Sequence, residues 1–141
     1  MKSFMLLAML AVLTSSLAGA AATSPTVIAA NAIPWVRESG TEFARIEGSS
    51  SGAGPYSFRI KYLRAGRSNP EYHSSVDHII VLAGTFSIGF GTRFDSQRMR
   101  KLSAGSFIIV PRMTAHYTLA TPGTIIQVYG VGRRTTTSAR P

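Results

Sequence analysis

Residues 66–84, GRSNPEYHSSVDHIIVLAG, decide the fold and concentrate the side chains that can bind a metal ion. The segment lies between two strand-like runs, and its polar half holds four metal-capable side chains: Glu71, His73, Asp77 and His78. Another histidine, His116, lies far downstream, after an apolar run and a turn that contains proline. We expect these two segments to converge on one site, with the rest of the chain as their scaffold.

The chain has the length of a single domain. Its 141 residues are enough to bury a core without disulfide or metal cross-links. It contains no cysteine, which excludes disulfides, thiolate metal ligands and a cysteine nucleophile.

The N-terminus has the three parts of a secretory signal peptide. Lys2 precedes an apolar run over residues 4–13, and Ala18-Gly19-Ala20 supplies the small-residue pattern of a cleavage site. The run is shorter than the roughly 20 residues that span a bilayer. We therefore predict a cleaved signal peptide over residues 1–22, a periplasmic or secreted protein, and no stable membrane insertion after cleavage. A retained anchor or a buried helix is the alternative.

The sequence is strongly basic, with 15 Lys and Arg against 6 Asp and Glu and a formal net charge of +9. Such a charge can indicate nucleic-acid binding. The cations are scattered, however, without a recognition helix or interleaved aromatic residues, and the predicted export argues against that partner. We expect no nucleic acid to bind, and interpret the charge as a solvated surface, with attraction to acidic ligands as the alternative.

Alternating and β-branched apolar runs predict an all-β fold. In residues 56–63, YSFRIKYL, apolar and polar side chains alternate with period two, as in a half-buried strand. Runs of the DHIIVLA and SFIIV type are interpreted as strands with little exposure on either face. We divide the mature chain into an extended arm with a first strand (23–55), a barrel core (56–132) and a flexible basic tail (133–141).

The spacing of residues 66–84 resembles the first motif of the cupin superfamily, which reads Gly, five residues, His-x-His, three or four residues, Glu, six residues, Gly. Asp77 stands at the Glu position, six residues before Gly84, and His73 stands at the second His. Glu71 occupies the first His position, and Gly66 lies one residue closer to Glu71 than the glycine of the motif lies to its first His.

The second cupin motif also has a counterpart in the sequence. Gly105, Pro111 and His116 match its spacing, whereas Met113 stands where the motif has glycine and Ala120 where it has asparagine. The chain resembles in particular the small exported single-domain cupins. This resemblance implies a conical β-barrel, the double-stranded β-helix or jelly roll, with a metal ion at its centre.

The resemblance implies four metal ligands: Glu71, His73, Asp77 and His116. Glu71 and His73 are two residues apart and project to the same side of an extended segment, whereas His78 faces the opposite side from Asp77. Two imidazoles and two carboxylates without sulfur favour iron or manganese, with zinc or nickel as alternatives.

Three functional hypotheses follow from these features. The first is an exported cupin that binds a divalent metal ion and carries out metal-dependent chemistry on an unidentified small molecule. The others are a non-catalytic barrel that binds a small ligand and a structural barrel that has lost its metal, because the fold alone does not define function. Edge strands and the apolar arm over residues 27–35 could support a homodimer.

Overall fold

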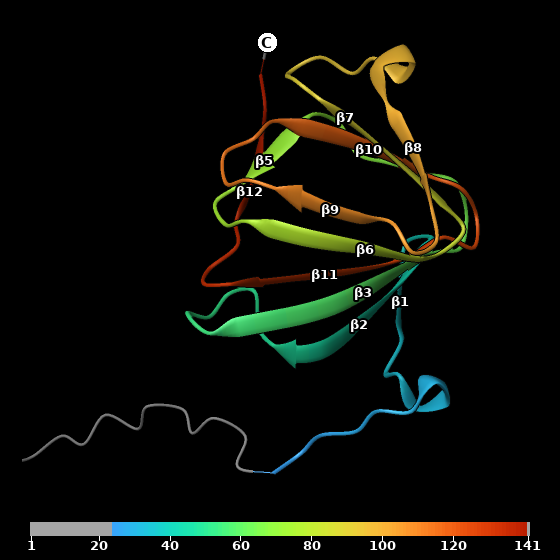
Figure 1. Cartoon of the computed structure of the whole chain (residues 1–141), viewed down its shortest axis with the longest axis vertical. Coiled ribbons are helices and arrows are strands. Elements are labelled where there is room, and N and C mark those ends of the chain that lie inside the picture. The colour runs from blue at the N-terminus through green and yellow to red at the C-terminus, as the bar shows by residue number, and fades with distance from the viewer. Residues whose placement is uncertain (1–23, 141) are drawn as a thin grey trace, which may run out of the picture.

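Two antiparallel β-sheets face each other in the computed structural model, which describes residues 24–140 (Figure 1). The first sheet contains, in spatial order, β1 (Val36–Glu38), β2 (Thr41–Gly48), β3 (Pro55–Tyr62), β11 (Ile125–Val131), β6 (Asp77–Ala83) and β9 (Phe107–Val110). The second contains β12 (Thr136–Ser138), β5 (Glu71–His73), β10 (His116–Ala120), β7 (Thr85–Phe90) and β8 (Arg100–Ser103), with β4 (Gly66–Arg67) also paired to β10.

Helical structure within residues 24–140 is limited to two short 3₁₀ turns. These are η1 (Ala30–Ala32) and η2 (Ser96–Arg98). Asp95 caps η2, because its carboxylate accepts a hydrogen bond of 2.9 Å from the backbone N–H of Gln97. In the part of the chain that the structure describes, no helix is long and apolar enough to cross a membrane.

The hydrophobic core lies between the two sheets. Along β3 the inward positions are Tyr56, Phe58, Ile60 and Tyr62, as the period-two pattern predicts. They pack against buried side chains of β6, β7, β9, β10 and β11: Ile79, Val81, Phe86, Ile88, Ile108, Val110, Ala120, Ile126 and Val128. The single-domain, all-β prediction is confirmed.

The hairpin between β6 and β7 depends on Gly84. Its φ is +74°, in the left-handed region that favours glycine, and a Cβ there would lie 2.7 Å from the Cα of Thr124. The turn therefore packs closely against Thr124, the residue directly before β11.

Two strands are more exposed than their sequences predict. In β9, Phe107 and Ile109 are 51% and 57% exposed, and in β6 Leu82 is also exposed. The reason is that β9 is an edge strand of the first sheet, so its outward side chains have a neighbouring strand on one side only. A continuous apolar run does not show which of its faces is buried.

The predicted chain divisions need two corrections. Thr136–Ser138 is a strand that pairs with β5, so residues 133–141 are not simply a flexible tail. The arm over 23–55 carries two strands, β1 and β2, instead of one. The predicted signal peptide over residues 1–22 lies outside the described residues.

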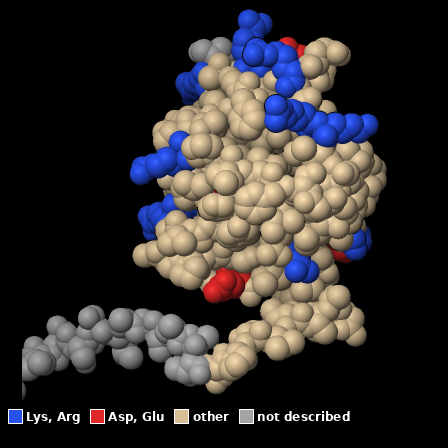
Figure 2. All heavy atoms as spheres, viewed as in Figure 1, with Lys and Arg blue, Asp and Glu red and all other residues tan. Residues whose placement is uncertain are grey.

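The charged side chains are unevenly distributed over the surface. Figure 2 shows lysine and arginine side chains around the margin of the visible face, most densely at the end that carries η2, and few acidic side chains. Together with the formal net charge of +9, this distribution favours attraction of small anions.

Candidate functional site

Glu71, His73 and His116 come together because β5 and β10 are neighbours in the second sheet. Glu71 pairs with His116 in the register, and His73 lies two residues further along β5, so all three project to one side. Each offers one ligand atom, and these atoms lie within 4.8 Å of one another. His73 Nε2 is 3.7 Å from Glu71 Oε1, and the two imidazole rings are 5.0 Å apart. The arrangement can hold a metal ion.

Both histidines are oriented by hydrogen bonds at Nδ1. His116 Nδ1 lies 3.0 Å from the carbonyl oxygen of Thr114, which can only accept, so Nδ1 carries the proton and Nε2 is free to bind a metal ion. His73 Nδ1 lies 3.1 Å from the hydroxyl of Thr136 on β12. Sequence reasoning missed Thr136, because one threonine in a polar segment carries no signal of its own.

Burial keeps the imidazole of His73 neutral. Burial lowers the pKa of His73 to about 4, and the nearby guanidinium of Arg134 also lowers it. Burial raises the pKa of Glu71, although His116 and Arg134 partly offset that effect. A neutral imidazole is the form that binds a metal ion, so His73 is ready to ligate at neutral pH.

Asp77, the fourth predicted ligand, is beside the cluster but engaged elsewhere. Its Oδ2 is 3.6 Å from His73 Nε2. Arg134 donates to both carboxylate oxygens, from Nε to Oδ1 at 2.9 Å and from Nη2 to Oδ2 at 2.8 Å, and the hydroxyl of Tyr56 donates to Oδ1 at 3.3 Å. The structure thus brings three of the four predicted residues together in a cluster that can hold a metal ion, and pairs the fourth with arginine. The prediction could not include this pair, because it treated residues 133–141 as a free tail.

His78 lies on the outer face of the first sheet. Its ring stacks on Tyr129 at a centroid distance of 4.8 Å and lies near Phe107. Strand parity predicted this side correctly, and His78 takes no part in the cluster.

In the turn before β10, Met113 has the left-handed backbone conformation that glycine usually adopts. Its φ is +60°, and its backbone N–H donates a hydrogen bond of 2.8 Å to the carbonyl of His73. Met113 stands where the cupin motif has glycine. The left-handed conformation that brings His116 to the site is therefore retained, at a steric cost.

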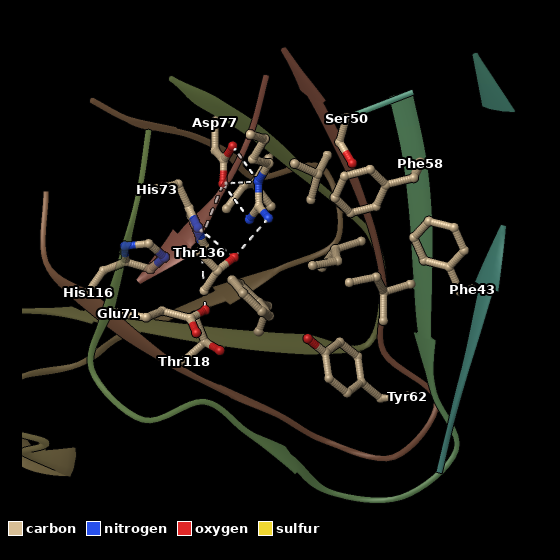
Figure 3. Close-up of a pocket in the computed structure, with 16 residues that line it drawn as sticks. Phe43, Ser50, Phe58, Tyr62, Glu71, His73, Asp77, His116, Thr118 and Thr136 are labelled. Carbon is tan, nitrogen blue, oxygen red and sulfur yellow. Dashed lines mark hydrogen bonds and ion pairs between the residues drawn. The ribbon is translucent and has the colours of Figure 1, made fainter. Parts of the chain in front are cut away.

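A cavity of about 350 Å³ extends from this cluster into the barrel. In Figure 3 the polar residues Glu71, His73, Asp77 and His116 lie on one side, and Phe43, Phe58 and Tyr62 lie on the other. Burial, with a smaller contribution from Glu71, raises the pKa of Tyr62 to about 12, so its hydroxyl stays protonated. The cavity therefore offers a polar end, an apolar wall and a neutral hydroxyl.

The segment after β11 closes one side of the cavity. The backbone N–H of Arg134 donates to the carbonyl of Ser50 at 2.7 Å, and that of Gly132 donates to Gly54 at 3.0 Å. Both Ser50 and Arg134 line the cavity. A polar segment and a Gly/Ser-rich loop thus position a cationic side chain within the barrel.

Comparisons with known proteins support the fold. No protein-family model matches the sequence, and no curated protein matches it. Among solved structures, the polyketide cyclase RemF from Streptomyces resistomycificus aligns with a TM-score of 0.64 and 18% identity over 84% of this chain and 87% of that one.

Two further structures give the same result. KdgF from Halomonas sp. has a TM-score of 0.60 and 19% identity over 78% of this chain and 96% of that one. An RmlC-like cupin from Shewanella frigidimarina has a TM-score of 0.61 and 15% identity over 78% of this chain and 94% of that one. The chain has the cupin fold, as its two motifs predicted.

Proposed function

We propose that the protein binds a divalent metal ion through Glu71, His73 and His116, and holds a small molecule beside it in the barrel. The observation that carries this proposal is the convergence of three ligand atoms within 4.8 Å at the end of a cavity. The neutral state of His73 and the fixed Nδ1–H of His116 add to it, because each leaves Nε2 available.

The ligand chemistry favours iron(II) or manganese(II), with zinc or nickel as alternatives. Two imidazoles and one carboxylate on one side of an ion are typical of non-haem iron sites and leave positions open for a substrate. When bound, the ion would supply Lewis acidity toward an oxygen atom of the small molecule. Enzymes occur among the similar solved structures, including RemF and an oxalate decarboxylase from Bacillus subtilis, and we extend the proposal to metal-dependent catalysis on this likeness.

Metal analysis tests the site directly. The protein is purified without chelating resin and analysed for iron, manganese, zinc and nickel, alongside the double variant His73→Ala/His116→Ala. His78→Ala is the matched control, because it removes the remaining histidine from the outer face. We expect about one ion per chain in the wild type and the control, and none in the double variant. A wild-type protein that is metal-free and resists reconstitution with all four metals contradicts the proposal.

A non-catalytic binding barrel is the second candidate function. The pairing of Asp77 with Arg134 favours it, because a site with one ligand fewer than the family pattern holds its ion less tightly. This candidate predicts ligand binding in the cavity without turnover.

We also propose that the protein is exported. The proposal rests on the sequence of residues 1–22 alone, and N-terminal sequencing of the mature form tests it. The exported chain should begin at Ala21 or Thr23, whereas a chain that begins at Met1 in a membrane fraction contradicts export.

A further inference from the structure

The cavity is built from two chemically different walls. The metal-capable side chains come from β5 and β10 in the second sheet, and Asp77 and Arg134 lie beside them. Opposite them, β2, β3 and β11 of the first sheet contribute the apolar residues Phe43, Phe58, Ile60, Ile126 and Val128. Figure 3 shows the separation of the labelled polar and aromatic residues across the open space. A ligand that fills the cavity must therefore have one polar end and one apolar end.

Once the proposed metal ion is bound, the charge at the polar end is the sum of four charged groups: the ion, Glu71, Asp77 and Arg134. The carboxylates of Glu71 and Asp77 together cancel the two charges of a divalent ion, and both histidines bind as neutral imidazoles. Arg134 lines the cavity and leaves one positive charge over. In a site lined by buried groups, an uncompensated charge is costly, so one negative charge on the ligand is favoured over none or two.

One nitrogen of Arg134, Nη1, remains for a ligand. Nε and Nη2 are used by Asp77, whereas Nη1 makes only a long contact of 3.5 Å with the hydroxyl of Thr136. A carboxylate can accept from this nitrogen with one oxygen and face the metal ion with the other, because it has two acceptor oxygens in one plane.

The apolar end limits the body of the ligand. A volume of about 350 Å³ is near the lower end of the roughly 300–1,000 Å³ typical of small-molecule sites. This volume accommodates one ring or a short branched chain. The phenyl rings of Phe43 and Phe58, whose centroids are 5.3 Å apart, offer an aromatic surface against which it can pack.

We propose that the cavity binds small monocarboxylates whose body is a single aromatic ring or a branched aliphatic chain. The inference rests on the proposed metal site and goes beyond it by naming the ligand class. It assigns Arg134 to the ligand carboxylate and the wall formed by β2, β3 and β11 to the ligand body.

Calorimetric titration with a matched set of probes tests the proposal. Protein loaded with Zn(II), its metal content measured first, is titrated with benzoate, benzamide, phthalate and acetate. Benzamide has the ring without the charge, phthalate has a second charge, and acetate lacks the ring. We expect benzoate to bind at least tenfold more tightly than each of the other three, and to lose that advantage in metal-free protein, where the charge of the site is negative.

A charge variant gives a second, independent readout. Asp77→Asn removes one negative charge, so the loaded site carries two positive charges while the amide oxygen can still accept from Arg134. Phthalate should then gain at least tenfold in affinity relative to benzoate. Phe107→Ala, on the outer face of the first sheet, is the control and should leave all four affinities unchanged.

The outcomes separate this inference from the proposed function. If the protein takes up zinc but benzamide or acetate binds as tightly as benzoate, or phthalate binds more tightly to the wild type, the ligand class is wrong and the metal site stands. If the protein takes up no metal, the proposed function fails and the inference falls with it.

Discussion

Arg134 Nη2 lies 2.8 Å from Oδ2 of Asp77, and its Nε lies 2.9 Å from Oδ1 of the same carboxylate. The pair joins the segment after β11 to the first residue of β6, and its acidic partner is almost fully buried. It engages both oxygens of Asp77, while Oδ2 remains 3.6 Å from His73 Nε2 in the neighbouring cluster. The pair therefore helps to close the cavity and contributes one charge of each sign to its lining. It also decides whether Asp77 is available to the proposed metal ion.

Removing Arg134 should destabilise the metal-free protein and make its stability depend on metal. Arg134→Gln leaves Asp77 as a buried carboxylate without a charged partner, and we expect a loss of about 3 kcal/mol in the free energy of unfolding. Urea denaturation with and without Zn(II) measures it. Zinc should stabilise the variant more than the wild type, because Asp77 becomes available to the ion. The double variant Arg134→Gln/Asp77→Asn should recover part of the loss; equal stability of the single variant and the wild type would contradict this account.

The stability of metal-free protein should fall in mild acid because of His73. Its pKa is lowered from 6.5 to about 4 in the folded state, so the unfolded chain binds the extra proton between these values. The contribution of neutral His73 to the free energy of unfolding is complete above pH 6.5. It is lost as the pH falls toward 4, by up to about 3 kcal/mol. Glu71, with its raised pKa, opposes part of this loss, while Asp77, His116 and Arg134 also face His73.

The comparison that isolates this effect is His73→Gln. Free energies of unfolding of both proteins, measured between pH 7.5 and 4, should converge as the pH falls. Parallel curves would show that His73 does not titrate in this range.

Thr136 should tune metal affinity without touching the ion. Thr136→Val removes the hydroxyl that lies 3.1 Å from His73 Nδ1 while preserving the shape of the side chain. We expect the dissociation constant for Zn(II) to rise about tenfold, at the lower end of the usual effect of such outer hydrogen bonds. Competition with a chromogenic chelator measures it, and the exposed neighbour Thr137→Val is the control. A similar change in both variants would indicate a general effect on β12.

Met113→Gly should stabilise the fold. The left-handed backbone at Met113, with φ of +60°, costs a non-glycine residue about 1–2 kcal/mol, whereas glycine adopts it freely but gains entropy in the unfolded chain. The net gain should be about 0.5–1 kcal/mol, or roughly 2–4 °C in Tm. Met99→Gly is the contrast, because Met99 has an ordinary extended backbone with φ of −82° and glycine there should destabilise the protein. A lower Tm for Met113→Gly argues against strain at this turn.

The sequence predicted those features that depend on local periodicity and fixed spacing. Alternation in β3 and the turn at Gly84 gave the barrel, and the two motif spacings brought His73 and His116 to one place. Strand parity separated His78 from the cluster, because neighbouring residues of a strand face opposite sides.

Features that depend on long-range contact were not predictable in the same way. Arg134 and Thr136 lie in a polar segment without apolar periodicity, and their roles come from partners 57 and 63 residues away. The exposure of Phe107 and Ile109 depends on the position of β9 at the edge of its sheet, which a single strand does not encode. In each case the partners or the exposure of the residue depend on which strands are neighbours in the folded sheets.

The apolar residues from β2, β3 and β11 and the imidazoles from β5 and β10 belong to different sheets. Substitutions can therefore change one group without changing the other. Substitutions in β3 and β11 can reshape the space that a ligand body occupies while the imidazoles on β5 and β10 keep their hydrogen bonds. New ligand preferences can thus arise, or be engineered, one apolar side chain at a time, without changing the residues that we propose bind a metal ion.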